Sequence, residues 1–222
     1  MADGRETESR GAFLGWPGWP VFRHFVFIAL ALTVWFAIVF VGADAFTAMH
    51  SARIAVHTRV ELGVPFVPWM IAAYMSIYLL FVMVPFVLRT RREVSEFGRT
   101  LAILIFVSGI SFLLLPAQLA FDPPSVLGIW GNVFQFADRL NLDYNLVPSL
   151  HVGLSAACVS VFTRYAAEMA RIVLWLWLLA ICMSTVLTHQ HHIIDVVTGL
   201  VLGLMSQQLI YARRVSLDSS HH

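Results

Sequence analysis

Three histidine and aspartate side chains lie where apolar segments of the sequence begin, and these residues are best suited to chemistry. His191 and Asp195 stand four positions apart, so a helix through both would place them on one face. A carboxylate in that position can accept a hydrogen bond from one imidazole nitrogen and leave the other free as a nucleophile or base. His151, near the start of an earlier apolar segment, is a candidate for proton transfer. Ionisable residues in apolar helices are costly, so each invites a functional hypothesis.

The segments that carry these residues are predicted to begin as helices on the same side of a membrane. The unpaired N–H groups and partial positive charge of two such helix N-termini favour an anion such as phosphate. Pro148 suits the first turn of a helix. Ser149 and His151 would therefore lie where a phosphate could dock.

Two motifs resemble those of a known family. Pro148-Ser149-Leu150-His151, followed by Ser184-Thr185, His191 and Asp195, is similar to the second and third motifs of the type 2 phosphatidic acid phosphatase superfamily. The Ser-Thr pair, in place of the usual Ser-Arg, resembles the inositol phosphorylceramide synthase branch and its bacterial relatives.

The resemblance implies a role for each residue at a matching position. His191 would be the nucleophile that becomes phosphorylated, and Asp195 would orient it. His151 would protonate the leaving alcohol and later activate water or an acceptor hydroxyl. Ser149 and Ser184 would bind phosphate oxygens. No cofactor is expected for this chemistry.

The sequence departs from the superfamily in its positive charges. All fourteen basic residues are arginine, so the lysine of the first motif is missing, and Thr185 replaces the arginine of the third. Thr185, Arg139, Asn145 and the two helix ends remain as candidates to bind the phosphate. A dianionic monoester would require more positive charge than these residues supply. The sparse positive charge therefore favours a diester or a transferase-like site.

The cluster of His189, His191 and His192 allows a different interpretation, namely a non-catalytic membrane protein that binds zinc or iron. Against it, His191 and His192 would point to different faces of a helix, and no cysteine or third carboxylate lies nearby. The motifs therefore predict a site without metal.

The composition indicates what must position these residues. The chain has 222 residues, of which 59% are hydrophobic and 12% charged, which is too apolar for a soluble domain. About 20 apolar residues are needed to cross a hydrocarbon core of about 30 Å. Such segments show no strand-like alternation, so we predict one all-α membrane domain over 1–222, a bundle of six transmembrane helices. The predicted spans are 22–43, 65–88, 100–120, 147–166, 170–189 and 192–211. In the last, Gly199 and Gly203 should allow close packing.

The arginines predict the orientation of these helices. If the first span runs outward, eleven arginines lie inside and three outside, which places both termini in the cytoplasm. A cytoplasmic tail is then expected over 1–20, an outer interfacial helix over 44–63 and an outer active-site loop over 121–147. We expect the chain in a bacterial inner membrane, among membrane lipids, with its active site on the outer face. A net charge of +1 argues against a nucleic-acid partner.

The predicted function is therefore a membrane phosphatase that cleaves the phosphate ester of a lipid through a phosphohistidine. The alternative within the same chemistry is a lipid phosphotransferase, similar to inositol phosphorylceramide synthase, that passes the phosphoryl or phosphoalcohol group to a lipid hydroxyl. The predicted partner is a phosphorylated lipid; protein partners cannot be predicted from these features.

Overall fold

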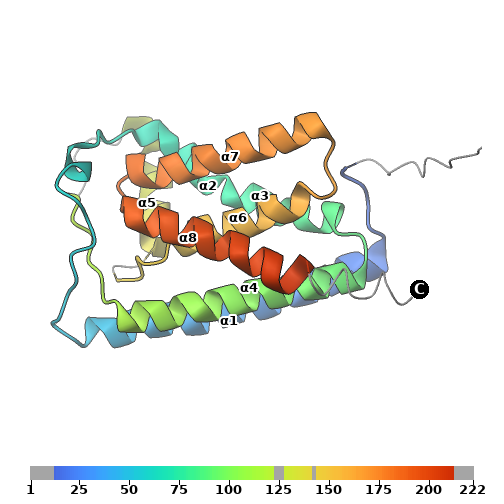
Figure 1. Ribbon diagram of the computed structural model, residues 1–222, viewed down its shortest axis with the longest axis horizontal. Helices are drawn as coiled ribbons and strands as arrows, with labels where there is room; N and C mark the ends of the chain where they lie inside the picture. Colours follow the sequence, from blue (N-terminus) through green and yellow to red (C-terminus); the bar gives the residue numbers. More distant parts are fainter. Residues whose placement is uncertain (1–12, 123–127, 142–143, 213–222) are drawn as a thin grey trace, which may run out of the picture.

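The computed structural model describes residues 13–122, 128–141 and 144–212, and this part of the chain is helical, with no strand (Figure 1). The elements in order are α1 Trp19–Ala48, η1 Glu61–Gly63, η2 Pro68–Met70, α2 Ile71–Met75, α3 Ile77–Val87, α4 Arg91–Leu114, η3 Gly128–Trp130, α5 Gly131–Asn141, α6 Leu150–Phe162, α7 Glu168–Leu187, α8 Ile193–Ser206 and η4 Gln207–Ala212.

Helices α1 and α4 lie side by side along most of their lengths and form one side of the bundle (Figure 1). Two glycines of α4 make this approach possible. A Cβ at Gly98 would lie 2.6 Å from Cγ2 of Ile28, and one at Gly109 would lie 2.3 Å from Cγ1 of Val39. Because both contacts advance in the same direction along the two helices, α1 and α4 run parallel.

Helix α6 is the buried centre of the bundle, packed against α3, α7 and α8. A Cβ at Gly199 would lie 2.3 Å from the carbonyl oxygen of Ser149, and one at Gly203 would lie 2.3 Å from that of Gly153. The prediction that these two glycines permit close helix packing is confirmed. The two contacts also show that α6 and α8 run parallel.

Five of the predicted spans are confirmed as helices long and apolar enough to cross a membrane. The segment predicted over 147–166 is instead a helix of 13 residues, about 20 Å long, which is too short by itself. The helix predicted over 100–120 begins earlier, at Arg91. Thr90 and Glu93 form a capping box there, which starts the helix in polar residues that a hydropathy pattern overlooks.

The interfacial helix predicted over 44–63 is wrong. Helix α1 continues to Ala48, and the chain then runs extended, with Ile54 N–H donating to the carbonyl of Pro116 over 2.9 Å. Val56 packs against Ala117 and its neighbours. Val56 thus packs against a second loop, whereas Met49, Ile54 and Val60 stay exposed, and none of them lies on the face of a helix.

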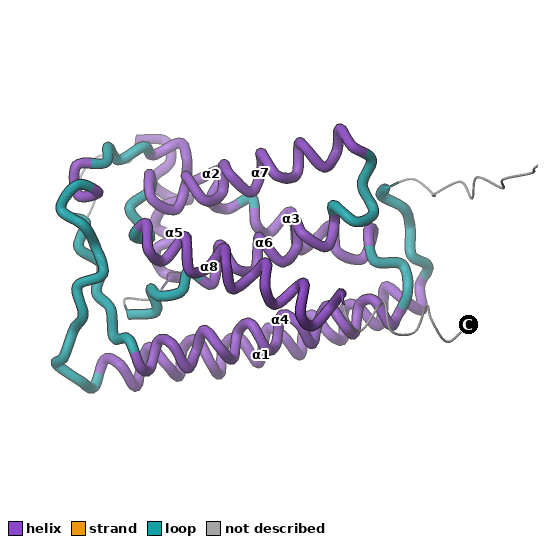
Figure 2. Tube along the Cα trace, in the orientation of Figure 1, coloured by secondary structure: helices purple, strands orange, loops and turns teal. Residues whose placement is uncertain are grey.

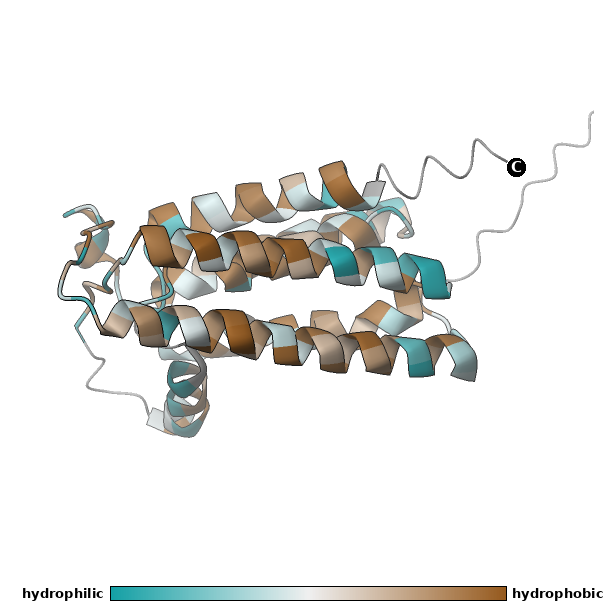
Figure 3. Ribbon diagram, turned by 90° about the horizontal axis from the view of Figure 1, so that it is seen from below, coloured by the Kyte–Doolittle hydropathy of each residue, from teal (hydrophilic) through white to brown (hydrophobic). Residues whose placement is uncertain are grey.

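The two loops that meet in this way cover one end of the bundle (Figure 2). Apolar residues dominate the middle of the long helices, whereas polar residues gather towards the ends (Figure 3). Of the predicted outer loop, residues 128–141 form η3 and α5, while 123–127 and 142–143 lie outside the described residues.

Candidate active site

A tight turn between α7 and α8 presents His191. The N–H groups of Gln190 and His191 both donate to the carbonyl of Thr185, over 2.9 and 3.1 Å, and close the end of α7. His189 has φ +56° in this turn, a left-handed conformation. The spacing predicted that His191 and Asp195 share one face of a helix. That prediction is wrong, because His191 lies in the turn before α8.

The turn nevertheless brings the predicted pair together. Nδ1 of His191 lies 3.4 Å from Oδ2 of Asp195, and the carboxylate is fully buried. This is long for a hydrogen bond, as catalytic contacts often are without substrate. The same Oδ2 accepts from the backbone N–H of His192 over 2.8 Å, which fixes the carboxylate. With Nδ1 directed at a carboxylate, Nε2 is the nitrogen of His191 that is left for chemistry.

His151 is held on the first turn of α6 by Tyr74 of α2. The two rings stack with centroids 3.9 Å apart, and Nε2 of His151 lies 2.9 Å from the carbonyl oxygen of Tyr74. A carbonyl can only accept, so Nε2 carries a proton. Nδ1 is then the nitrogen that can give or take a proton during a reaction.

Both histidines line one cavity of about 460 Å³, together with Asn145. They reach it from the α7–α8 turn and from α6, while Asn145 comes from the segment before α6. Nδ2 of Asn145 donates to the carbonyl of Phe40 over 2.6 Å, whereas its Oδ1 is buried without a hydrogen-bond partner among the described residues. The cavity thus combines two imidazoles with one amide acceptor.

The predicted serine and threonine ligands do not line this cavity. Ser184 and Thr185 are buried in α7, and their hydroxyls donate to the carbonyls of Ile181 and Cys182. Hydroxyls in helices commonly bond back to the preceding turn in this way. Their role as phosphate ligands stays a prediction.

Ser149 is the N-cap of α6, where its Oγ accepts from the N–H of Val152 over 3.3 Å. Its own N–H donates to the carbonyl of Asp195 over 2.9 Å, so the cap of α6 is tied to the first turn of α8. Pro148 precedes the cap and is not part of the first turn. The structure supports Ser149 in positioning the two helices, and its contact with phosphate remains a prediction.

Positive charge is sparse at the site. Within the described part of the chain, no arginine lines the cavity, and Arg139 is exposed on α5. Arg53 lies with its guanidinium 4.1 Å from the ring centre of Tyr144, the residue next to Asn145. The expectation that Arg139 binds phosphate therefore gains no support from its position.

A carboxylate that the sequence did not single out occupies the N-terminus of α8. Glu61 is 2% exposed, and its Oε2 accepts from the N–H of Ile193 over 2.8 Å. Its Oε1 accepts from the N–H of Thr58. The helix end predicted to receive phosphate thus already holds the protein's own anions, Glu61 and Asp195. The N-terminus of α6, the other helix end predicted to bind phosphate, has no acidic residue in its first turn.

The three neighbouring histidines face different partners. His189 has Nε2 3.0 Å from the carbonyl of Val64, and its ring stacks on Phe121. Nε2 of His192 accepts from the N–H of Ala120 over 3.1 Å, and its Nδ1 lies 3.8 Å from Glu61. Burial lowers the pKa of His192, although Asp195 and Glu61 act in the opposite direction.

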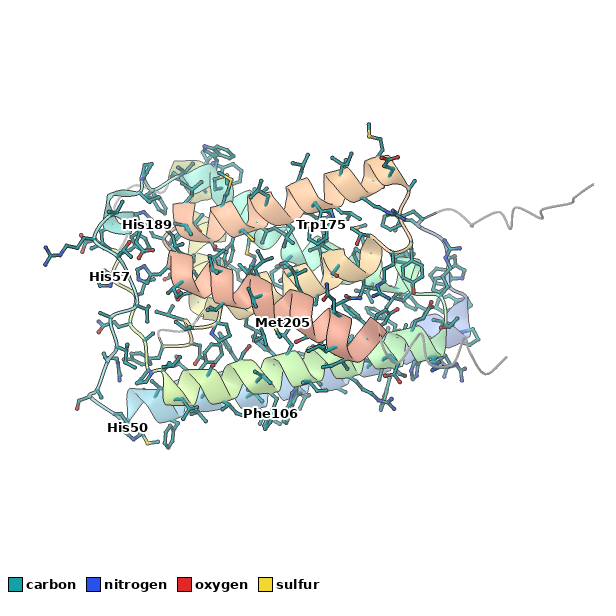
Figure 4. All side chains as sticks on the ribbon, viewed as in Figure 1. His50, His57, Phe106, Trp175, His189 and Met205 are labelled. Carbon is teal, nitrogen blue, oxygen red and sulfur yellow. The ribbon has the colours of Figure 1, made fainter. Side chains whose placement is uncertain are left out.

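No group of three histidine, cysteine, aspartate or glutamate side chains within the described ranges could hold a metal ion. His50, His57 and His189 lie at the same end of the bundle, while Phe106, Trp175 and Met205 lie along its length (Figure 4). The metal-binding alternative therefore has no geometric support in the residues that suggested it.

Comparison with known proteins finds one similar family. Residues 122–216 match the model of the PAP2 superfamily, over the stretch that carries both motifs and the whole of α6, α7 and α8. This match, together with five apolar helices of membrane-spanning length, fits a membrane phosphatase or phosphotransferase. It does not separate the inositol phosphorylceramide synthase-like branch from the others. No curated protein and no solved structure matches the chain.

Proposed function

We propose that the chain is a membrane lipid-phosphate phosphatase that works through a phosphohistidine on His191. The observation that carries this proposal is the pairing of His191 with the buried Asp195 at a cavity that His151 also lines. An imidazole oriented by a carboxylate, with a second imidazole available for proton transfer, is the arrangement that a two-step displacement requires.

In the first step, Nε2 of His191 attacks phosphorus and the bond from phosphorus to the lipid oxygen breaks. His151, protonated on both nitrogens, gives the proton on Nδ1 to the leaving alkoxide, which departs as an alcohol. In the second step, Nδ1 of His151 takes a proton from water while that water attacks phosphorus. Inorganic phosphate leaves and His191 is restored.

Two observations favour transfer as a second candidate function. A cavity that no arginine lines, within the described ranges, suits a singly charged diester better than a dianionic monoester. The buried Oδ1 of Asn145 can also accept a hydrogen bond from an acceptor alcohol. In that reaction a lipid hydroxyl replaces water in the second step.

Purified protein in lipid nanodiscs should be offered lipid monophosphates, pyrophosphates and phosphodiesters, with released phosphate and new lipid products both measured. Free phosphate without a new lipid supports the phosphatase, and a new phosphorylated lipid supports the transferase. Activity should survive EDTA because the proposed steps use side chains alone. Loss of activity that a single metal restores would favour the metal-binding alternative.

The site is proposed to face the outside of a bacterial inner membrane, with both termini in the cytoplasm. The charge asymmetry between the two ends of the bundle supports this orientation. Arg89, Arg91 and Arg92 lie where α4 begins, at the end of the bundle opposite the turn between α7 and α8 (Figure 1).

A further inference from the structure

The cavity that receives His151 and His191 continues far beyond them. Helix α1 contributes one stripe of lining residues at helical spacing, from Phe40 to Phe25. These ends are fifteen residues apart, which is about 22 Å at the α-helical rise. Asn145 bonds to the carbonyl of Phe40, so the histidines lie at that end, and the other end reaches the first turns of α4.

Nearly all of this length is apolar. The part away from the histidines is walled by α1, α3 and α4, for example by Leu32, Phe81 and Leu101. Water gains no hydrogen bonds in such a space, whereas a hydrocarbon chain loses nothing by entering it. A long apolar cavity with polar groups at one end matches a molecule with one polar head and one chain.

The cavity also reaches the outer surface of the bundle along the seam between α1 and α3, which make few contacts with one another. Thr33 of α1 and Tyr78 of α3 both line it and are both exposed, the latter by 46%. Thr33 lies in the candidate membrane span Trp19–Ala48 and Tyr78 in the span Pro68–Val87, so this opening would face lipid. A chain could therefore enter sideways from the membrane.

We propose that this cavity is the binding site for one hydrocarbon chain of the substrate, with the chain end near Phe25 and the phosphate at His191. The inference rests on the proposed function for the identity of the head group, but not for the chain. It makes the site selective for a long, straight chain that can fill about 22 Å.

The probe for this proposal is hexadecyl phosphate with a photoreactive diazirine on its terminal carbon, bound to the full chain in nanodiscs. Illumination should label the segments 25–32 of α1 or 94–101 of α4. Label confined to lipid-facing positions such as Ile172 and Leu176 of α7, which are 50% and 59% exposed, would overturn the proposal. Because this readout needs no turnover, it separates the chain site from the proposed reaction.

A matched pair of substitutions tests the same site through specificity. Ala29 lines the cavity, and Ala31, two positions further along α1, is exposed. Ala29→Trp should displace the label and lower the ratio of kcat/KM for hexadecyl over butyl phosphate by about tenfold, while Ala31→Trp should leave both unchanged. Partition into the nanodisc cancels because the same substrates and lipids are used. Equal labels and ratios in the two variants, with equal melting temperatures, would contradict the proposal.

Discussion

At the scale of single residues, the need for His151 should depend on how readily the leaving group departs. His151→Ala should slow hydrolysis of a lipid phosphate about a hundredfold or more, because the alkoxide leaves poorly without a proton. The same variant should be much less impaired with an activated aryl phosphate, whose leaving group scarcely needs protonation. Steady-state rates with both substrates test this, and an equal loss with both would remove His151 as the acid.

Glu61 should act as a positioning residue for the turn that carries His191. Glu61→Gln removes the negative charge beside the N–H of Ile193 with little change in the size of the side chain. We expect kcat to fall about tenfold with little change in KM, as for other residues that orient a catalytic group.

Glu168→Gln, at an exposed position in the first turn of α7, is the control for Glu61→Gln. A fall in melting temperature with unchanged kcat would show that Glu61 is merely structural.

The sequence alone was sufficient to name His151, His191, Asp195 and Asn145, since local motifs carry the first three and the fourth stands just before one. It was not sufficient for Glu61, which contacts Ile193 from a distant loop that has no local signal of its own. Glu61 stands out only because its carboxylate is buried, and the sequence does not show that burial.

At the scale of helices, the contact between α6 and α8 should tolerate no side chain at Gly199. A Cβ there would lie 2.3 Å from the backbone oxygen of Ser149, which cannot move without moving the cap of α6. Gly199→Ala should therefore destabilise the protein by about 1–3 kcal/mol and lower activity.

Gly42→Ala on α1 is the matched control, because a Cβ there meets nothing within 4 Å. Alanine is the better helix former, so this variant should be unchanged or up to about 1 kcal/mol more stable. Melting temperatures in the same detergent compare the two. Equal melting temperatures would show that the two helices can separate without cost.

Hydropathy predicted the helices that face lipid. It failed where helix capping, burial within the bundle or contacts distant in sequence determine the structure. Thr90 and Glu93 start α4 by capping, although the first turn is charged. Helix α6 need not match the thickness of a bilayer because other helices surround it: Val152, Cys158 and Val161 are all fully buried. The stretch after Ala48 is extended rather than helical because it contacts a loop about sixty residues further along the chain. A local sequence pattern contains no information on such a contact.

At the scale of the whole molecule, the placement of arginines predicts how the bundle sits in its membrane. A reporter fused to the C-terminus should be cytoplasmic, and one inserted near Pro124 should be external, because cytoplasmic loops carry the excess of arginine. Activity of paired reporters that function on opposite sides of the membrane measures this. A C-terminal reporter active only outside would reverse the proposed orientation and place the site on the inner face.

The proposed mechanism depends most on a covalent phosphate on His191. Protein mixed briefly with radiolabelled lipid phosphate and quenched in alkali should carry acid-labile label, and mass spectrometry should place it on His191. His191→Ala should abolish both label and turnover, since it removes the nucleophile. Asp195→Asn should slow label formation about a hundredfold or more. Full turnover by the His191 variant, or label mapped to His189 or His192, would contradict the proposed mechanism.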